Sequence, residues 1–161
     1  MTKEHRNFGV LYGDKLNDKT PNDQVNGHTV TYLDRIFNRY APNIYNKMLK
    51  YCQFADNYCK WNLLFDDAFG TKCIEYIQYK EKGDNLGWHC DMGSLVTIVI
   101  MLTNSNQYQG GIFQTRYLNK TINIPLECGD IVVFSSDKCN HRVTNLIQGK
   151  RVVLCMELIF W

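Results

Sequence analysis

The amino-acid sequence predicts a mainly β domain of the α+β class, a jelly-roll barrel in which N-terminal helices support one sheet. Two observations lead to this prediction. Helical spacing of apolar residues is confined to the part of the chain before residue 70, and from residue 72 onward short apolar runs alternate with turn residues. Helices gathered at one end of such a series do not fit alternating βαβ units.

Residues 1–30 are polar and contain Gly9, Gly13, Pro21 and Gly27 among many Asn, Asp and Thr residues. This composition favours turns, so we expect a polar N-terminal segment in which short strands or an ordered loop can still occur. The segment has no apolar core of signal-peptide length, and no later apolar run is long enough to cross a membrane. We therefore expect a cytoplasmic protein with no membrane partner.

Apolar residues recur at helical spacing between residues 31 and 70, which we interpret as supporting helices. A first series includes Leu33 and Tyr40, and a second series follows Pro42. Because proline fits the first turn of a helix, we expect one short helix that ends near Tyr40 and a longer helix from about Pro42 to Tyr58. The Tyr and Met side chains on these helices are interpreted as core packing.

Residues 71–161 are expected to form the barrel and to carry the catalytic core. Apolar runs of strand length cover residues 73–79, 95–102, 131–134 and 152–158. Turn residues lie between them, and about seven or eight short strands at this spacing predict a sandwich or a barrel. A chain of 161 residues, of which 45% are hydrophobic, can bury one core, so we expect a single domain over residues 1–161.

The charge and cysteine content exclude several classes of function. The formal net charge is +2, and the Lys and Arg residues are scattered, so the sequence does not indicate a nucleic-acid or membrane partner. Seven cysteines, an odd number without any Cys-x-x-Cys pair, argue against a zinc knuckle and against a fully paired disulfide framework. We expect reduced cysteines and a small-molecule or peptide substrate.

Three residues have the spacing of an open metal site: His89, Asp91 and the distant His141. On a pleated strand His89 and Asp91 project to the same side, so both can reach one ion. Two imidazoles and one carboxylate form the facial triad that suits non-haem Fe(II) and leaves coordination positions free for chemistry. Arg151, ten residues after His141, offers a planar fork for a carboxylate, whereas Lys150 would point to the opposite face of the strand.

A series of motifs in fixed order spans residues 72–160: Tyr79, His89-Cys90-Asp91, Thr97, Gly110-Gly111-Ile112-Phe113, residues 129–134, His141 and Gly149-Lys150-Arg151. This series resembles the core of the Fe(II)- and 2-oxoglutarate-dependent dioxygenases, and within them the prolyl and lysyl hydroxylases. The resemblance implies a double-stranded β-helix of the cupin-like, jelly-roll type with two helices braced against its major sheet.

The resemblance also implies an activity: hydroxylation of a substrate C–H bond coupled to conversion of 2-oxoglutarate into succinate and CO2. It implies Fe(II) as the metal, with His89, Asp91 and His141 as catalytic ligands, and ascorbate as a candidate reductant. The contacts that it assigns to 2-oxoglutarate are Arg151, for the far carboxylate, together with Tyr79 and Thr97. The protein then supplies orientation and exclusion of water around the cofactor.

A peptidyl proline or lysine is the leading substrate, because the motifs resemble those of the prolyl and lysyl hydroxylases. Substrate specificity, however, resides in loops outside these motifs. An AlkB-like nucleic-acid demethylase is less well supported, since Arg151 is not part of an Arg-rich signature. A small-molecule oxygenase and a non-catalytic jelly-roll binding module stay as alternatives. His5 and His28 are assigned no role, and Trp88 is expected either to wall the pocket or simply to pack.

Overall fold

The computed structural model describes residues 10–12, 27–33, 36–65 and 68–160. Its helices are α1 (Phe37–Tyr40), α2 (Pro42–Cys59) and the short 3-10 helix η3 (Ser105–Gln107). Its strands, in chain order, are β1 (Val10–Tyr12), β2 (Thr29–Tyr32), β3 (Phe69–Tyr79), β4 (Leu86–His89), β5 (Val96–Met101), β6 (Tyr108–Gly110), β7 (Phe113–Tyr117), β8 (Lys120–Ile124), β9 (Ile131–Ser135), β10 (His141–Val143), β11 (Leu146–Gly149) and β12 (Arg151–Phe160).

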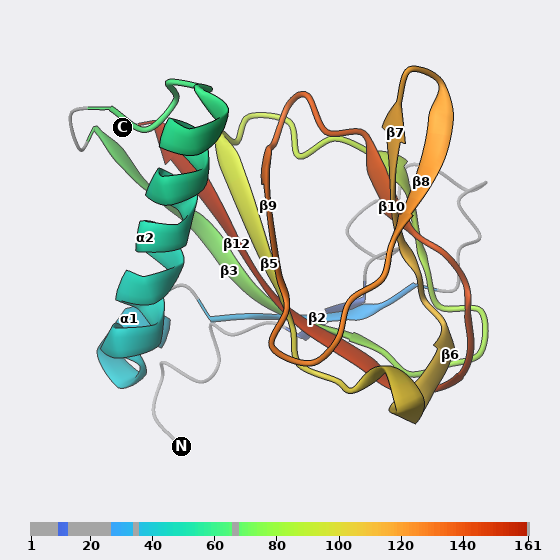
Figure 1. Ribbon diagram of the computed structural model, residues 1–161. Helices are drawn as coiled ribbons and strands as arrows, with labels where there is room; N and C mark the ends of the chain where they lie inside the picture. Colours follow the sequence, from blue (N-terminus) through green and yellow to red (C-terminus); the bar gives the residue numbers. More distant parts are fainter. Residues whose placement is uncertain (1–9, 13–26, 34–35, 66–67, 161) are drawn as a thin grey trace.

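The strands form two main sheets that face each other, with α2 along the outer side of the larger one (Figure 1). The larger sheet has the order β1-β2-β3-β12-β5-β9, the smaller has the order β4-β10-β7-β8, and β11 pairs with β6. The pairs within these sheets are antiparallel. The predicted class, a mainly β double-stranded β-helix with N-terminal helices against the major sheet, is confirmed.

Strand β12, at the centre of the larger sheet, divides the apolar residues into two cores. Val153 and Cys155 belong to the core between the two sheets, whereas Leu154 and Met156 belong to the core beneath the helix. Successive side chains of a strand project to opposite faces, so an uninterrupted apolar run is the sequence of a strand that is buried on both sides. Arg151 is on the same face of β12 as Val153 and Cys155, the face that points toward the smaller sheet.

Helix α2 begins at Pro42, which occupies the first turn, and ends before Lys60, whose φ of 54° is left-handed. Met48 and Cys52 on its inner face are almost fully buried against the outer face of the larger sheet. Burial of each such side chain contributes about 2 kcal/mol relative to exposure. The expected helix from about Pro42 to Tyr58 is therefore confirmed, and so is the packing role of Met48. The same interpretation is wrong for Tyr40, Tyr51 and Tyr58, which are exposed.

The boundary expected at residue 31 differs from the structure. Thr29–Tyr32 is strand β2, which pairs with β3, and helix α1 is confined to Phe37–Tyr40. Strand β3 begins at Phe69, before the expected start of the barrel segment at residue 71. The Thr-Val-Thr-Tyr segment has strand-forming residues, but it is too short for its alternation to be told from the helical spacing that follows it. The N-terminal third thus contributes a strand to the barrel as well as helices to its outside.

Gly110 lies where two loops approach each other closely. Gly110 has a φ of 76°, and a Cβ there would collide with the backbone oxygen of Asn145, so only glycine allows this close approach of the two loops. The seven cysteines are all free. Within the residues that the structure describes, no helix is both long enough and apolar enough to cross a membrane.

Candidate metal centre and co-substrate pocket

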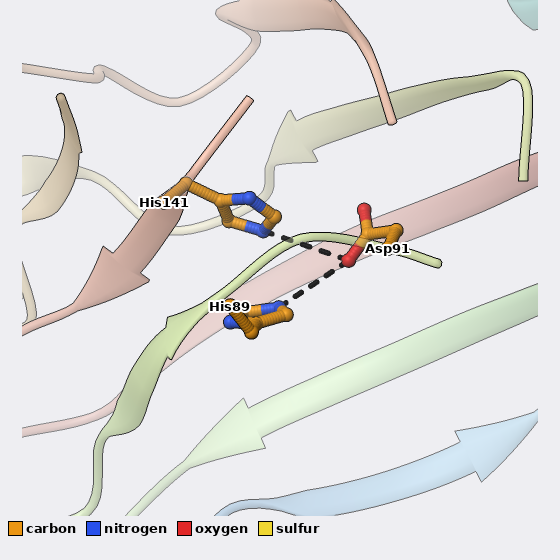
Figure 2. A group of neighbouring side chains, drawn as sticks. All are labelled: His89, Asp91 and His141. Atoms are coloured by element: carbon orange, nitrogen blue, oxygen red, sulfur yellow. Dashed lines mark ion pairs between the residues drawn. The ribbon is translucent and has the colours of Figure 1, made fainter. Parts of the chain in front are cut away.

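The two histidines lie on neighbouring antiparallel strands of the smaller sheet. His89 is the last residue of β4, His141 is the first residue of β10, and the two are direct partners in the register. Asp91 follows two residues after His89, and the three side chains point toward one another (Figure 2). Oδ1 of Asp91 lies 3.3 Å from Nε2 of His89 and 3.8 Å from Nε2 of His141. Two imidazole nitrogens and one carboxylate oxygen therefore converge on one point.

Each imidazole is oriented by a hydrogen bond on its other nitrogen. Nδ1 of His89 lies 2.8 Å from the carbonyl oxygen of Gly87, and Nδ1 of His141 lies 3.0 Å from the carbonyl oxygen of Cys139. A carbonyl only accepts, so in both rings Nδ1 carries a proton and Nε2 is the nitrogen that faces Asp91. Both Nε2 atoms are thus set up as metal ligands.

The carboxylate of Asp91 is oriented from the larger sheet. The hydroxyl of Thr97 donates to Oδ2 of Asp91 at 2.7 Å, and the hydroxyls of Thr97 and Ser136 are 2.9 Å apart. The backbone N–H of Asp91 also donates to the carbonyl of Ser136 at 3.1 Å. Oδ1 is left to face the two imidazoles. The sequence predicted a role for Thr97 but not for Ser136, which is part of no recognisable motif.

The ionisation of the three residues suits a metal ion. Burial and the neighbouring His89 lower the pKa of His141, so it is neutral near pH 7. Burial disfavours the charged form of Asp91, but hydrogen bonds from His89 and Thr97 outweigh it and lower its pKa. For His89, burial is likewise outweighed, by hydrogen bonds to Asp91 and Gly87, and its pKa is raised. A metal ion would replace that proton, since ligand imidazoles must be neutral.

The triad lines a cavity of about 390 Å³ between the two sheets. Tyr79 and Thr97 also line it, together with the apolar side chains of Val99, Phe113 and Val153. A mostly apolar cavity with a few convergent polar groups is the usual form of a small-molecule site. The cavity therefore brings together the metal triad and two of the residues predicted to contact the co-substrate.

Arg151 lies deeper along the same face of the larger sheet. It is the first residue of β12, is paired with Tyr79 in the register, and is only 1% exposed. Its guanidinium carbon lies 5.0 Å from the centre of the Tyr79 ring. Within the part of the chain that the structure describes, none of its three guanidinium nitrogens has a hydrogen-bond partner. Lys150, the competing cation, is exposed.

A buried charge without a partner is strongly destabilising, and arginine stays charged at any physiological pH. The guanidinium of Arg151 is therefore chemically suited to bind a carboxylate. Gly111 makes room for it, since a Cβ there would lie 2.9 Å from Cδ of Arg151. The side chains thus fit both an open-sided metal ion and a dicarboxylate whose far end reaches Arg151.

His28 is a residue of this region that the sequence analysis left without a role. Its Nδ1 lies 3.2 Å from the carbonyl oxygen of Asn85, and its ring is 5.2 Å from the ring of Tyr79. It also lines the cavity. Strand β2, which follows His28, pairs with β3 and so brings His28 to the cavity, which the sequence did not predict. That it has no role stays a prediction. His5 lies outside the described residues.

Trp88 does not wall the cavity. It precedes His89 on β4 and so projects to the opposite face of the smaller sheet. There its ring lies between two guanidinium groups, 4.1 Å from that of Arg116 and 4.7 Å from that of Arg142. Trp88 therefore packs on the outside through cation–π contacts.

A double-stranded β-helix with a 2-His-1-carboxylate triad between its sheets defines the class of the mononuclear non-haem iron proteins. The family model described as the 2OG-Fe(II) oxygenase superfamily matches residues 74–156. The chain belongs to this superfamily. The match covers β4 to β11 and most of β3 and β12, and includes His89, Asp91, His141 and Arg151.

Similarity to individual proteins points in the same direction. A PKHD-type hydroxylase of Prochlorococcus marinus is 31% identical over 77 residues, which are 44% of this chain and 34% of that protein. The chain thus spans about a third of the length of the curated relative that it matches.

Two solved structures share the fold. A prolyl-4-hydroxylase of Pseudomonas putida has a TM-score of 0.66 at 17% identity, over 92% of this chain and 80% of that one. The second is a prolyl hydroxylase of Trichoplax adhaerens in complex with a hypoxia inducible factor oxygen degradation domain peptide fragment. Its TM-score is 0.63 at 18% identity, over 95% of this chain and 70% of that one.

Proposed function

We propose that the protein is an Fe(II)- and 2-oxoglutarate-dependent dioxygenase that hydroxylates a peptide at a proline or lysine and releases succinate and CO2. The observation that carries the proposal is the buried guanidinium of Arg151, which lacks an anion partner within the described residues and lies on the cavity face that leads to the triad. A structural metal site alone would not require this cation. A dicarboxylate that reaches from the metal to Arg151 would.

His89, Asp91 and His141 would hold the metal through Nε2, Oδ1 and Nε2. Fe(II), when bound, supplies the activation of oxygen that is coupled to decarboxylation of 2-oxoglutarate. Asp91 offsets one charge of a divalent ion, which leaves a net positive centre for an anionic co-substrate. The bond from Thr97 to Oδ2 would keep Asp91 in one orientation during turnover.

Arg151 would bind the far carboxylate of 2-oxoglutarate through its planar fork. Tyr79 would contribute a hydroxyl beside it, and burial, which raises the pKa of Tyr79 to about 12, keeps that hydroxyl protonated as a donor. A contact of Thr97 with 2-oxoglutarate stays a prediction, since the Thr97 hydroxyl already donates to Asp91. The apolar walls formed by Val99, Phe113 and Val153 would exclude water from the reacting atoms.

A peptide substrate is supported by the fold shared with prolyl hydroxylases, one of which holds a peptide. These structures cover 92% and 95% of this chain, which supports one catalytic domain over residues 1–161. Ascorbate as the reductant stays a prediction. The AlkB-like and small-molecule alternatives have no feature of the cavity that favours them over a peptide.

The test begins anaerobically, with Fe(II) and 2-oxoglutarate added to the protein. The expected result is a weak visible charge-transfer band, followed by succinate formation when oxygen is admitted. His141→Ala should abolish both signals, whereas Lys150→Met, at an exposed site, should leave both unchanged. A protein that gives neither band nor succinate, with or without peptides, would be a jelly-roll binding module and the proposal would be wrong.

A further inference from the structure

The outer face of the smaller sheet, which points away from the barrel interior, carries two arginines over one aromatic ring. Trp88 precedes His89 on β4 and Arg142 follows His141 on β10, so both side chains project outward. The guanidinium carbons of Arg116 and Arg142 lie 4.1 Å and 4.7 Å from the centre of the Trp88 ring. The smaller sheet lies on the side of the molecule away from α2 (Figure 1). Two positive charges are therefore held close together on one surface.

Neither arginine has an anionic partner. Within the described residues, Arg116 and Arg142 take part in no ion pair. Nε of Arg142 donates to Oε1 of Gln114 at 2.6 Å, and Gln114 in turn donates to Asn123 at 2.6 Å. These bonds fix Arg142 on the sheet and leave its terminal nitrogens, Nη1 and Nη2, for an acceptor outside the described part of the chain. Because like charges repel, a bound anion would stabilise the pair.

A groove of about 430 Å³ opens beside Arg142. Arg142 lines it, and so do Ile112 and Ile147, whose side chains are 39% and 56% exposed. No acidic residue is among the described residues that line it. The metal triad and Arg151 do not line it either, so the groove is not part of the co-substrate site. An unpaired cation and exposed apolar side chains thus meet at one opening.

The chemistry of the groove suits a peptide segment that carries an acidic and an aliphatic side chain. The planar fork of an arginine can bind a carboxylate bidentately, and arginine is enriched at protein interfaces. The aliphatic side chain would cover Ile112 and Ile147 and remove their apolar surface from water. Charge and apolar surface therefore favour the same kind of ligand.

A nucleic acid is the competing ligand for a surface with two arginines. Single strands bind where bases can stack on aromatic side chains along a basic groove. The Trp88 ring is already covered by Arg116 and Arg142, which leaves no platform for a base. The formal net charge of +2, with scattered Lys and Arg residues, provides no basic track for a phosphate backbone. An acidic peptide is the better match.

We propose that this groove, with Arg142 and Arg116 beside it, is a docking surface for a partner protein that contributes a segment with acidic and aliphatic side chains. Arg142 and Arg116 bind the carboxylates, and Ile112 and Ile147 pack against the aliphatic side chain. The surface is on the opposite side of the smaller sheet from the triad. The inference therefore goes beyond the proposed function and does not depend on it.

The test measures binding of fluorescent peptides to the full chain by anisotropy at low salt. The first peptide combines glutamate and leucine, the second has glutamine in place of glutamate, and the third has serine in place of leucine. We expect the first peptide to bind at least tenfold more tightly than the other two. A variant with both Arg116→Gln and Arg142→Gln should bind the first peptide no better than the second. Lys50→Gln, which removes an exposed cation on α2, is the matched control and should bind as the wild type does.

Ile147→Ser is a second variant, at a side chain exposed enough to leave folding intact. It should weaken binding of the first peptide severalfold and leave binding of the third unchanged. Equal binding of the first two peptides, no measurable binding of the first, or the same loss in Lys50→Gln would each overturn the inference. A single-stranded oligonucleotide that displaces the first peptide and binds more tightly would also overturn it, in favour of a nucleic acid. Peptide binding needs no charge-transfer band and no succinate, so this inference and the proposed function can fail separately.

Discussion

At the scale of single residues, the site depends on which atom of each side chain is left free. Thr97 holds Oδ2 of Asp91 and a backbone carbonyl holds Nδ1 of each histidine, so Oδ1 and the two Nε2 atoms are the ones left for the proposed metal. Arg151 differs from these residues because none of its atoms is held: all three guanidinium nitrogens are buried without a hydrogen-bond partner among the described residues. The atoms that are left free therefore indicate the ligand that each group suits: a metal ion for Asp91 and the histidines, and an anion for Arg151.

Arg151→Met should raise the 2-oxoglutarate concentration needed for half-maximal succinate formation by about a hundredfold, because a pair of charge-assisted hydrogen bonds is worth about 3 kcal/mol. Iron binding should be unchanged, because Arg151 lies at the opposite end of the face from the triad. The measurement is succinate formation at varied 2-oxoglutarate, with Lys150→Met as the control. A larger effect of Lys150→Met than of Arg151→Met would show that the anchor has been wrongly assigned.

Glu75 should make the stability of the metal-free protein depend on pH. Burial and the neighbouring Glu157 raise the pKa of Glu75 from 4.5 to about 7 in the folded protein. Between these pH values the folded state binds more protons than the unfolded state, so the free energy of unfolding falls as pH rises through this window. The loss contributed by this group should approach 3 kcal/mol above pH 7.

The measurement is urea unfolding in chelator between pH 5 and 8. Glu75→Gln should unfold with a smaller pH dependence than the wild type and should be the more stable of the two above pH 7. Glu81→Gln, which changes an exposed carboxyl in the turn after β3, is the control and should show the pH dependence of the wild type. If Glu75→Gln and the wild type have parallel curves, Glu75 titrates normally and is not in the environment described.

At the scale of elements, one buried carboxylate connects helix α2 to the chain that leads into β3. Asp56, near the end of α2, is 4% exposed, and its two oxygens accept the backbone N–H groups of Leu63 and Leu64 at 3.0–3.2 Å. The left-handed Lys60 turns the chain back so that these donors reach Asp56. These bonds hold the segment that follows α2 against the end of the helix.

Asp56→Ala should therefore destabilise the protein by about 3 kcal/mol, because two buried N–H groups lose a charged acceptor. The residues proposed as iron ligands are on other elements, so the variant should retain 2-oxoglutarate binding at temperatures where it is folded. Denaturant unfolding of Asp56→Ala against Asn57→Ala, an exposed position in the same turn of the helix, checks the effect. Equal stability of the two variants would contradict the role of Asp56.

At the scale of the whole molecule, the metal centre joins the two sheets. The histidines come from the smaller sheet, whereas Asp91 is held by Thr97 of the larger sheet and by Ser136, which follows β9. A metal ion bound to all three would link sheets that otherwise meet through side-chain packing. Metal binding and folding should therefore be coupled.

Anaerobic Fe(II) at a hundred times its dissociation constant should stabilise the folded protein by about 2.7 kcal/mol, and raise Tm by roughly 5–10 °C. The measurement is thermal unfolding followed by circular dichroism, with and without metal. His141→Ala should show little or no rise. An equal rise in His141→Ala would mean that the stabilising ion binds elsewhere.

The sequence by itself determined the class of fold, the helix from Pro42, and the residues that we propose as ligands of the metal and of the co-substrate carboxylate. These properties are local: strand and helix periodicity, a proline at a helix start, and a His-x-Asp pair that one strand carries to one face. The strand at Thr29–Tyr32 escaped prediction because four residues give too little periodicity to identify it.

Only the tertiary structure decided which side chains meet around the triad. Strand register placed Thr97 and Ser136 beside Asp91, His28 beside Tyr79, and Glu75 on the wall of the cavity that the triad lines. Register between strands that are far apart in the chain depends on packing of the whole barrel, and one residue of slippage would reverse every side chain. The sequence alone therefore predicts the metal ligands, and the folded chain shows which groups hold those side chains in place.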